Sequence, residues 1–247
     1  SIITVCFNSE KTIENTILSV IGQSYRNIEY IIIDGGSTDD TIKIINKYSN
    51  FIAKFISEKD DGIYNAINKG IKLASGDLIS ILHSDDFYLN DRILQQVTNI
   101  FQDNSSLDCL IGTTIMRSKL DNRDIRKYSP KNFKNWMLFL GVSPPHPSLF
   151  LKSKIYKKYG VYKETLKIAS DFDFYLRILF KIKIKYKTID DTLVAMRYGG
   201  TSTKSFKSNF LSSKEILKSF KENGIYNNWL IILLRFPFKI FQFFFKK

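Results

Sequence analysis

Two adjacent carboxylates, Asp85 and Asp86, are the residues whose type and spacing most clearly point to chemistry. They follow a mainly apolar run at residues 78–82, as expected for a buried strand of a parallel sheet. Neighbouring negative charges repel each other, and a divalent cation such as Mg²⁺ or Mn²⁺ offsets that repulsion through oxygen ligands. The pair therefore predicts a metal site that could hold a substrate diphosphate. The alternative is that the pair caps the next helix.

Polar side chains also follow two earlier apolar runs, because Asn8 comes after residues 2–7 and Asp34 after residues 30–33. Ligands of open parallel sheets bind beyond the carboxyl ends of the strands, so we expect these side chains and the acidic pair to share one edge. The sequence has neither a GxxxxGK[ST] motif nor a GxGxxG motif after its first strand. This disfavours a P-loop kinase and a dinucleotide enzyme, and favours a nucleoside diphosphate held through metal.

The elements that must position these residues alternate between strand and helix, a pattern typical of βαβ units. Buried strands are predicted at residues 2–7, 30–33 and 78–82, with amphipathic helices at 13–21, 42–48 and 63–74. Beyond Asp86 we expect helices around 93–101 and 172–179, and strands near 110, 115, 149–151, 182 and 193. The predicted fold class is α/β, with a Rossmann-like domain and a mainly parallel central sheet over 1–205. A basic, aromatic helical tail at 206–247 follows.

Charge and aromatic residues are concentrated at the C-terminus. The 247 residues include 37 Lys and Arg against 24 Asp and Glu, a formal net charge of +13. Residues 204–247 hold nine of those basic residues, two acidic ones and eleven aromatics. We expect no nucleic-acid partner, because the basic and aromatic residues lie in the tail and not on the main domain. Residues 229–245 suit an anionic membrane interface, or alternatively a helix packed on the domain or in a dimer contact.

The compartment is predicted from the cysteines and from the hydropathy pattern. Cys6 and Cys109 lie in apolar stretches, and their spacing matches neither a disulfide framework nor a zinc site. The sequence shows no signal peptide and no apolar stretch of about 20 residues. Ser1 lies inside an apolar run, so we expect further residues before it. Together with the tail, these features predict a cytoplasmic protein associated peripherally with the inner face of the cell membrane.

Several short motifs occur in the order and spacing of one known family. They are SIITVCFN (residues 1–8), IDGGSTDDT (33–41), DGIYNAINKG (61–70), GD (76–77) and SDD (84–86). In these motifs the chain resembles the family-two glycosyltransferases, which have the GT-A fold, and the likeness extends to about residue 200. The composition, rich in Lys, Ile, Asn and Phe, is typical of an AT-rich genome. The resemblance therefore implies a bacterial enzyme of cell-surface polysaccharide synthesis.

The resemblance implies a nucleoside-diphosphate sugar as donor, with a UDP-sugar expected, and Mn²⁺ or Mg²⁺ as cofactor. The metal is expected on Asp86, because SDD matches the Asp-x-Asp-like motif of the family with Ser at its first position. The residues expected to contact the nucleotide or the donor sugar are Thr4, Val5, Phe7, Asn8, Asp34, Asp61, Ser84 and Asp85. The acceptor implied by the resemblance is a lipid-linked glycan or an oligosaccharide.

The catalytic base is expected in the second half of the chain. ASDFDFYLR (residues 169–177) resembles the family motif at a helix start. An inverting transfer needs a carboxylate opposite the leaving diphosphate, to take the proton of the acceptor hydroxyl as its oxygen attacks the anomeric carbon. We assign this role to Asp171, with Asp173 as the weaker candidate. The alternative for Asp171 is that it caps the helix.

Two loops and one rival function stay open at this point. His146, between two prolines, resembles a family segment on the acceptor side of the pocket, and a structural role is the alternative. Residues 199–202 resemble a loop that closes over the diphosphate, and an ordinary turn is the alternative. The rival function is a nucleotidyltransferase acting on sugar phosphates. Such an enzyme ordinarily has a Gly-rich basic loop where this chain has FNSE at residues 7–10.

Overall fold

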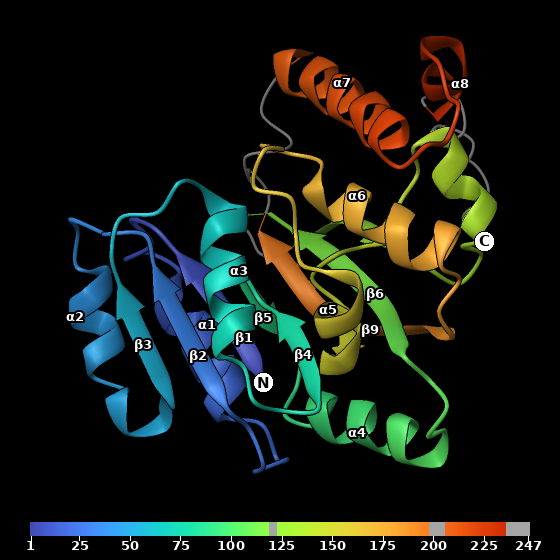
Figure 1. Ribbon diagram of the computed structural model, residues 1–247. Helices are drawn as coiled ribbons and strands as arrows, with labels where there is room; N and C mark the ends of the chain where they lie inside the picture. The colour runs from blue at the N-terminus through green and yellow to red at the C-terminus, as the bar shows by residue number, and fades with distance from the viewer. Residues whose placement is uncertain (119–122, 198–205, 236–247) are drawn as a thin grey trace.

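The computed structural model describes residues 1–118, 123–197 and 206–235, which form one mixed sheet with helices on both faces (Figure 1). The strand order across the sheet is β3-β2-β1-β4-β8-β6-β9-β5, and β7 pairs with β6 outside that path. The loop predicted at residues 199–202 and the end of the predicted tail, residues 236–247, lie outside the described residues.

The N-terminal half contains the predicted parallel strands. They are β1 (Ile2–Cys6), β2 (Tyr30–Asp34) and β4 (Leu78–Ile81), and a further strand that was not predicted, β3 (Lys54–Ser57), pairs parallel with β2. The helical segments between them are α1 (Ile13–Ile21), α2 (Thr41–Asn46), the short 3-10 turn η1 (Ser49–Phe51) and α3 (Ile63–Leu73). Cys6 of β1 is in register with Asp34 of β2, so the chain leaves both strands at the same edge of the sheet.

The second half adds strands of both directions. Its strands are β5 (Asp86–Tyr88), β6 (Cys109–Arg117), β7 (Asp124–Tyr128), β8 (Leu149–Lys152) and β9 (Tyr186–Arg197). Its helical segments are α4 (Ile93–Asp103), η2 (Asn135–Leu140), α5 (Ser153–Tyr159), α6 (Ser170–Tyr175), η3 (Leu176–Lys181), α7 (Phe206–Glu222) and α8 (Trp229–Leu233). β8 runs antiparallel between β4 and β6, whereas β6 and β9 are parallel.

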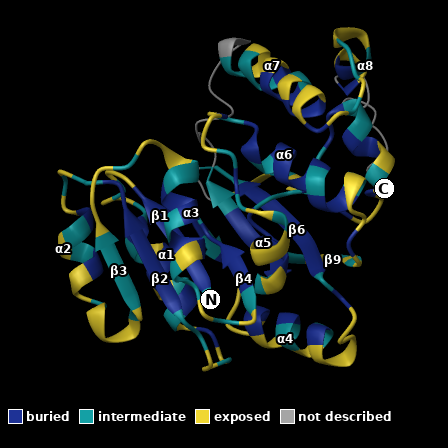
Figure 2. Cartoon of the chain, in the orientation of Figure 1, coloured by how far each residue is buried: buried dark blue, intermediate teal, exposed yellow. Residues whose placement is uncertain are grey.

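The continuous apolar runs of the central strands follow from burial on both faces of the sheet. Along β1, Ile3 lies in one hydrophobic cluster, with α3, α5, α6 and α7. Its neighbour Ile2 lies in the other cluster, with α1, α2 and α4. Successive side chains of a strand point to opposite faces, so the apolar positions of β1 divide between the two cores. Figure 2 shows these strands as buried beneath the helices.

Several predicted elements differ from the structure. The strands expected near residues 110 and 115 are one strand, β6. The strand expected near residue 182 is wrong, because α6 continues into the π-helical turn η3 and Lys183 has a positive φ of 58°. The prediction missed β7, because its sequence DIRKY is mostly polar and exposed, as an edge strand allows.

The predicted tail begins with a helix that belongs to the core. Ile216 and Phe220 of α7, and Ile232 of α8, are buried in the same cluster as α3 and α6. In Figure 1 α7 lies above α6, and α8 lies beside one end of α7. Arg235 is buried and donates to the Ser213 hydroxyl at 2.9 Å, which ties the end of α8 to α7. Among the described residues, no helix is long and apolar enough to cross a membrane. The division of the chain at residue 205 stays a prediction.

Candidate active site

A large cleft opens at the carboxyl ends of β1 and β4. It has a volume of about 1510 Å³, and its wall includes residues from both halves of the chain. The predicted site residues that line it are Val5, Phe7, Asn8, Ser84, Asp85, Asp86 and Asp171. The fold therefore brings together the end of the first strand, the acidic pair and the start of α6, as the motif order predicted.

The acidic pair forms part of the cleft wall. Asp86 starts β5 and is only 2% exposed, whereas Asp85 is half-buried. The Thr16 hydroxyl donates to the Asp86 carbonyl oxygen at 2.7 Å, which anchors this turn to α1. The Ser84 and Ser9 hydroxyls lie 2.8 Å apart and join it to the loop after β1. The backbone of the pair is thus fixed from two sides.

The carboxylate of Asp86 suits a cation. Its Oδ2 atom is buried and has no hydrogen-bond partner among the described residues. Burial, with the nearby charge of Asp85, raises the pKa of Asp86 well above its ordinary value. A divalent metal would give that oxygen a partner and keep the carboxylate ionised. The described residues contain no cluster of three or more metal-ligating side chains, so substrate oxygens and water would have to complete the coordination.

The turn after β2 gives a different role to Asp34 than the predicted nucleotide contact. Asp34 is fully buried and does not line the cleft. Its carboxylate accepts hydrogen bonds from the backbone N–H groups of Gly36 and Ser37 at 3.1 and 2.9 Å, and from the Ser57 hydroxyl at 2.7 Å. Asp34 therefore builds the turn. Asn8 reaches this turn from the cleft side, where its Oδ1 accepts from Thr38 N at 2.9 Å.

Two further predicted contact residues lie outside the cleft wall. Thr4 is fully buried, and its hydroxyl pairs with the Tyr30 hydroxyl at 3.1 Å, away from the cleft. Asp61 is exposed and does not line the cleft, whereas its neighbour Asp60 does. Asp60 was missed because two adjacent aspartates give the same sequence signal. Its Oδ1 accepts from Gly62 N at 2.9 Å, which starts α3 beneath the cleft.

The space beside Asp60 is kept open by a glycine. A Cβ atom at Gly35 would lie 2.5 Å from Oδ2 of Asp60 and 3.5 Å from the ring of Phe7. Phe7 is 60% exposed and lines the cleft, so an apolar ring and a carboxylate border the same corner. An aromatic face and a hydrogen-bond acceptor are the groups that a planar base with an N–H donor would use.

Asp171 lies at the start of α6 on the cleft wall. Its Oδ1 accepts the N–H of Phe172 at 2.8 Å. The N-cap of α6 is Ala169, and no side chain caps the helix there, so the capping alternative for Asp171 is wrong. Burial raises the pKa of Asp171 to about 6. A carboxylate with a pKa near neutrality is suited to accepting a proton and releasing it again.

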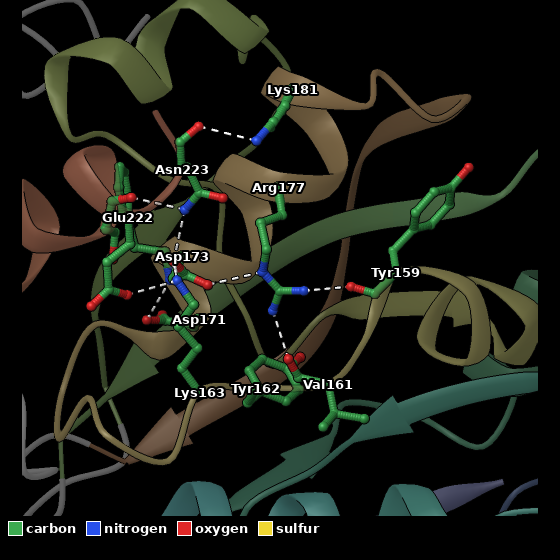
Figure 3. Close-up of polar contacts among 12 residues, drawn as sticks. Tyr159, Val161, Tyr162, Lys163, Asp171, Asp173, Arg177, Lys181, Glu222 and Asn223 are labelled. Atoms are coloured by element: carbon green, nitrogen blue, oxygen red, sulfur yellow. Dashed lines mark hydrogen bonds and ion pairs between the residues drawn. The ribbon is translucent and has the colours of Figure 1, made fainter. Parts of the chain in front are cut away.

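Asp173, the weaker candidate for the base, is committed elsewhere. It is fully buried and does not line the cleft. Its carboxylate forms ion pairs with Lys163 at 2.8 Å and with Arg177 at 2.9 Å (Figure 3). Arg177 in turn donates to the carbonyl oxygens of Tyr159 and Val161, both at 2.6 Å. Asp173 therefore organises the loop before α6.

His146 lines the cleft as a neutral side chain. Its Nε2 lies 2.8 Å from the Tyr162 hydroxyl, and its ring is stacked with His83 at 6.0 Å between centroids. Burial, with His83 nearby, lowers the pKa of His146 to about 3. At physiological pH it can offer one donor and one acceptor, but no charge.

Comparison with known proteins decides the family. A sequence model described as Glycosyl transferase family 2 matches residues 1–160. The chain belongs to this family. An uncharacterized glycosyltransferase of Mycobacterium tuberculosis is 34% identical over 178 residues, which are 72% of this chain and 67% of that relative. The UDP-Glc:alpha-D-GlcNAc-diphosphoundecaprenol beta-1,3-glucosyltransferase WfaP of Escherichia coli is 40% identical over 100 residues, 39% of each chain.

Solved structures confirm the fold of this family 2 glycosyltransferase. S. aureus TarS, residues 1–349 in complex with UDP-GlcNAc, has a TM-score of 0.68 at 20% identity, over 89% of this chain and 65% of that one. A mannosyltransferase of Pyrobaculum calidifontis in complex with GDP-Man and Mn²⁺ has a TM-score of 0.65 at 17% identity, over 90% and 63%. The chain spans less than two thirds of the length of either. The fold is that of the GT-A neighbours, as predicted.

Proposed function

We propose that this glycosyltransferase moves a sugar from a UDP-sugar to a hydroxyl of a lipid-linked or oligosaccharide acceptor, with inversion, in bacterial surface polysaccharide synthesis. The observation that carries the proposal is one cleft with two unlike carboxylates. Asp86 presents a buried, unpartnered oxygen on one wall, and Asp171 has a pKa of about 6 on another. Environments that differ in this way suit one group for a cation and the other for a proton.

The donor would occupy the end of the cleft formed by the N-terminal half. Val5, Phe7 and Asn8 line this end of the cleft and would contact the base and the ribose. TarS in complex with UDP-GlcNAc, and the name of the E. coli relative, support a UDP-sugar. Asp86, with Asp85 and Ser84 beside it, would hold Mn²⁺ or Mg²⁺. When bound, the ion neutralises the diphosphate and makes it a better leaving group.

Asp171 would act on the acceptor. Its carboxylate removes the proton of the acceptor hydroxyl while that oxygen attacks the anomeric carbon from the side opposite the diphosphate. The C–O bond to the diphosphate breaks as the new C–O bond forms, so the configuration inverts. His146 is neutral and lines the cleft, and it would hydrogen bond to a sugar hydroxyl through Nδ1, because Nε2 already faces the Tyr162 hydroxyl. The nucleotidyltransferase alternative loses its support, because the family match favours glycosyl transfer.

The acceptor and the location of the enzyme are inferred from the C-terminal surface. α8 exposes Leu230, Leu233 and Leu234, and Trp229 stacks with Phe210 of α7 at 5.5 Å. An exposed apolar and aromatic face suits shallow insertion into a membrane, and the exposed Lys214 of α7, one turn after Phe210, suits an anionic one. We place the enzyme at the cytoplasmic face of the cell membrane, where the E. coli relative's diphosphoundecaprenol acceptor supports a lipid-linked substrate.

The test is donor hydrolysis across a panel of nucleotide sugars, with Mn²⁺, with Mg²⁺ and with EDTA. We expect metal-dependent release of UDP from one UDP-sugar. Asp86→Ala is expected to abolish both that release and metal-stimulated UDP binding, with an unchanged circular dichroism spectrum. Equal activity in EDTA, or near-normal activity of the variant, would refute the metal role of Asp86.

A further inference from the structure

One side chain of α7 forms hydrogen bonds with the backbone just before α6. Glu215 is 7% exposed, and its carboxylate accepts three backbone hydrogen bonds. Lys167 N donates to Oε1 at 2.8 Å, and Ile168 N and Ala169 N donate to Oε2, both at 2.9 Å. Hydrogen bonds to an ionised acceptor are the stronger kind. Both oxygens of Glu215 therefore hold a single stretch of main chain that ends where α6 begins.

This stretch leads directly to the proposed base. Asp171 follows Ala169 by two residues, in the first turn of α6. From the opposite side, the Tyr64 hydroxyl of α3 donates to the Ile168 carbonyl oxygen at 2.8 Å. The approach to α6 is thus held between α3, whose start forms the donor side of the cleft, and α7. Moving Glu215 would release one of those two restraints.

The far end of α7 holds α6 a second time. Nδ2 of Asn223, just after α7, donates to Asp173 Oδ1 at 3.0 Å, and Lys163 bridges Asp173 and Glu222 at 2.8 and 2.9 Å (Figure 3). Between the two attachments, Phe220 packs edge-on against Phe172 at 5.6 Å. α6 is therefore fixed to α7 on both sides of Asp171.

We infer that α7 is a positioning element of the active site, and that Glu215 is the residue through which it orients Asp171. The inference rests on the proposed role of Asp171 as the base. α7 lies outside the region matched by the family model, residues 1–160, and it carries none of the motifs from which the site was predicted. Glu215 is a positioning residue, because its carboxylate hydrogen bonds to the main chain and does not line the cleft.

The charge of Glu215 provides a readout that distinguishes positioning from mere stability. The titratable groups that act on Asp171 are Tyr64 of α3, Tyr162, Tyr175 of α6 and Glu215. Burial raises the pKa of each of the three tyrosines, so they stay neutral. The negative charge of Glu215 adds to the effect of burial and raises the pKa of Asp171. Removing that charge lowers the pKa of Asp171.

The experiment compares Glu215→Gln with Lys221→Gln in the full chain. Lys221 lies on the same helix, but its side chain is exposed and makes none of the contacts with α6 described above. For Glu215→Gln we expect a loss of kcat on the order of 10²-fold from misplacement of the base. Its donor KM is expected to change by less than about twofold, because the donor side is untouched. The acid limb of its kcat profile is expected to move below pH 6, whereas Lys221→Gln should keep the wild-type profile.

Three outcomes separate the inference from the proposed function. If Asp171→Asn keeps its activity, Asp171 is not the base, whatever the result for the Glu215 variants. If Asp171→Asn is inactive but Glu215→Gln retains the wild-type kcat and acid limb, the positioning role is wrong and the base stands. A lower kcat with an unmoved acid limb would also overturn it. If Glu215→Gln does not fold, Glu215→Asp replaces it, and this variant should lower kcat with the acid limb near pH 6.

Discussion

Burial acts on Asp86 and Asp171 in the same direction but with different consequences. Both carboxyl groups have a raised pKa. Asp86 has an oxygen without a partner among the described residues, so a cation bound there would stabilise its charge. Asp171 keeps a backbone hydrogen bond from Phe172, so its charged form is tolerable near neutral pH. This difference suits the proposed roles, Asp86 to a metal ion and Asp171 to a proton, and it depends on tertiary packing that no local motif encodes.

The pH dependence of kcat should report Asp171. Only the ionised carboxylate accepts a proton, so kcat is expected to be constant above about pH 6 and to fall about tenfold per pH unit below it. Asp171→Asn should lower kcat by about 10²–10⁴-fold with little change in donor KM. Steady-state rates at saturating donor, from pH 4.5 to 8.5, measure both. An acid limb near pH 4, or a product that retains the donor's anomeric configuration, would contradict this mechanism.

The same variant should gain stability. A carboxyl group whose pKa is raised in the folded state stabilises the fold below its unfolded pKa, and loses that contribution as the pH rises through the folded value. The amide of Asn carries no charge and can still accept from Phe172 N. Asp171→Asn is therefore expected to melt above the wild type at pH 7.5, with a smaller difference at pH 4. Thermal unfolding at both pH values checks the sign, and a lower melting temperature at pH 7.5 would contradict it.

Asp60 and Asp61 offer a matched pair of single-residue tests. Asp60 borders the corner of the cleft with Phe7, whereas Asp61 is exposed outside it. Asp60→Ala is expected to raise the donor KM about tenfold or more, the effect of losing one hydrogen bond to a base, with kcat less affected. Asp61→Ala should behave as wild type. UDP binding by calorimetry and steady-state kinetics measure the difference, and equal effects of the two variants would remove Asp60 from the donor site.

Sequence alone could place the donor-side loops but not the atoms within them. The motif after β2 predicted a turn that lies beside the cleft. The carboxylate of Asp34, however, accepts hydrogen bonds from the backbone N–H groups of that turn. Thr4 follows the same logic, because a strand's side chains alternate and its hydroxyl points to Tyr30. Which of two neighbouring residues faces a ligand depends on the face of a strand or the exit of a turn, and a motif does not show it.

At the scale of elements, α3 packs closely on β1 beside the proposed donor site. Gly70 of α3 meets Ile3 of β1, and a Cβ atom there would clash with the Ile3 side chain. Gly70→Ala is expected to destabilise the protein by about 1–3 kcal/mol, because an extra methyl group in a packed core forces its neighbours apart. Lys72→Ala, exposed on the same helix, is the control. Urea unfolding measures both, and an unchanged midpoint for Gly70→Ala would contradict the close approach.

The predictability of the elements follows how much of each is buried. β1, β2 and β4 were predicted because burial on both faces makes them continuously apolar. α6 was expected to continue to residue 179 but becomes the π-helical turn η3 after Tyr175. Its apolar pattern continues through that turn, since Leu176, Ile178 and Leu179 are all buried. Hydrophobic periodicity therefore marked the segment but could not reveal the change of helix type.

At the scale of the whole molecule, the C-terminal segment does two jobs. Its inner face completes the core and holds α6 through Ile216, Phe220 and Glu215. Its outer face exposes the leucines of α8. The alternatives left open by composition, a membrane-facing tail or a helix packed on the domain, are therefore compatible. Removing the whole segment would test both at once, so only point variants on the outer face address the membrane.

Leu230 and Leu233 provide that test. Both are exposed, Leu230 by 76%, so replacing them with Glu should leave the core intact while adding charge to the proposed membrane face. We expect the Leu230→Glu, Leu233→Glu variant to lose most of its sedimentation with anionic lipid vesicles. Leu18→Glu, an equivalent change on the exposed side of α1, should bind vesicles as the wild type does.

Donor hydrolysis should stay normal in both variants, since α8 does not line the cleft. Transfer to a lipid-linked acceptor should fall with vesicle binding in the first variant only. If vesicle binding survives both substitutions, α8 does not face the membrane, and its exposed leucines must be assigned to a contact with another protein.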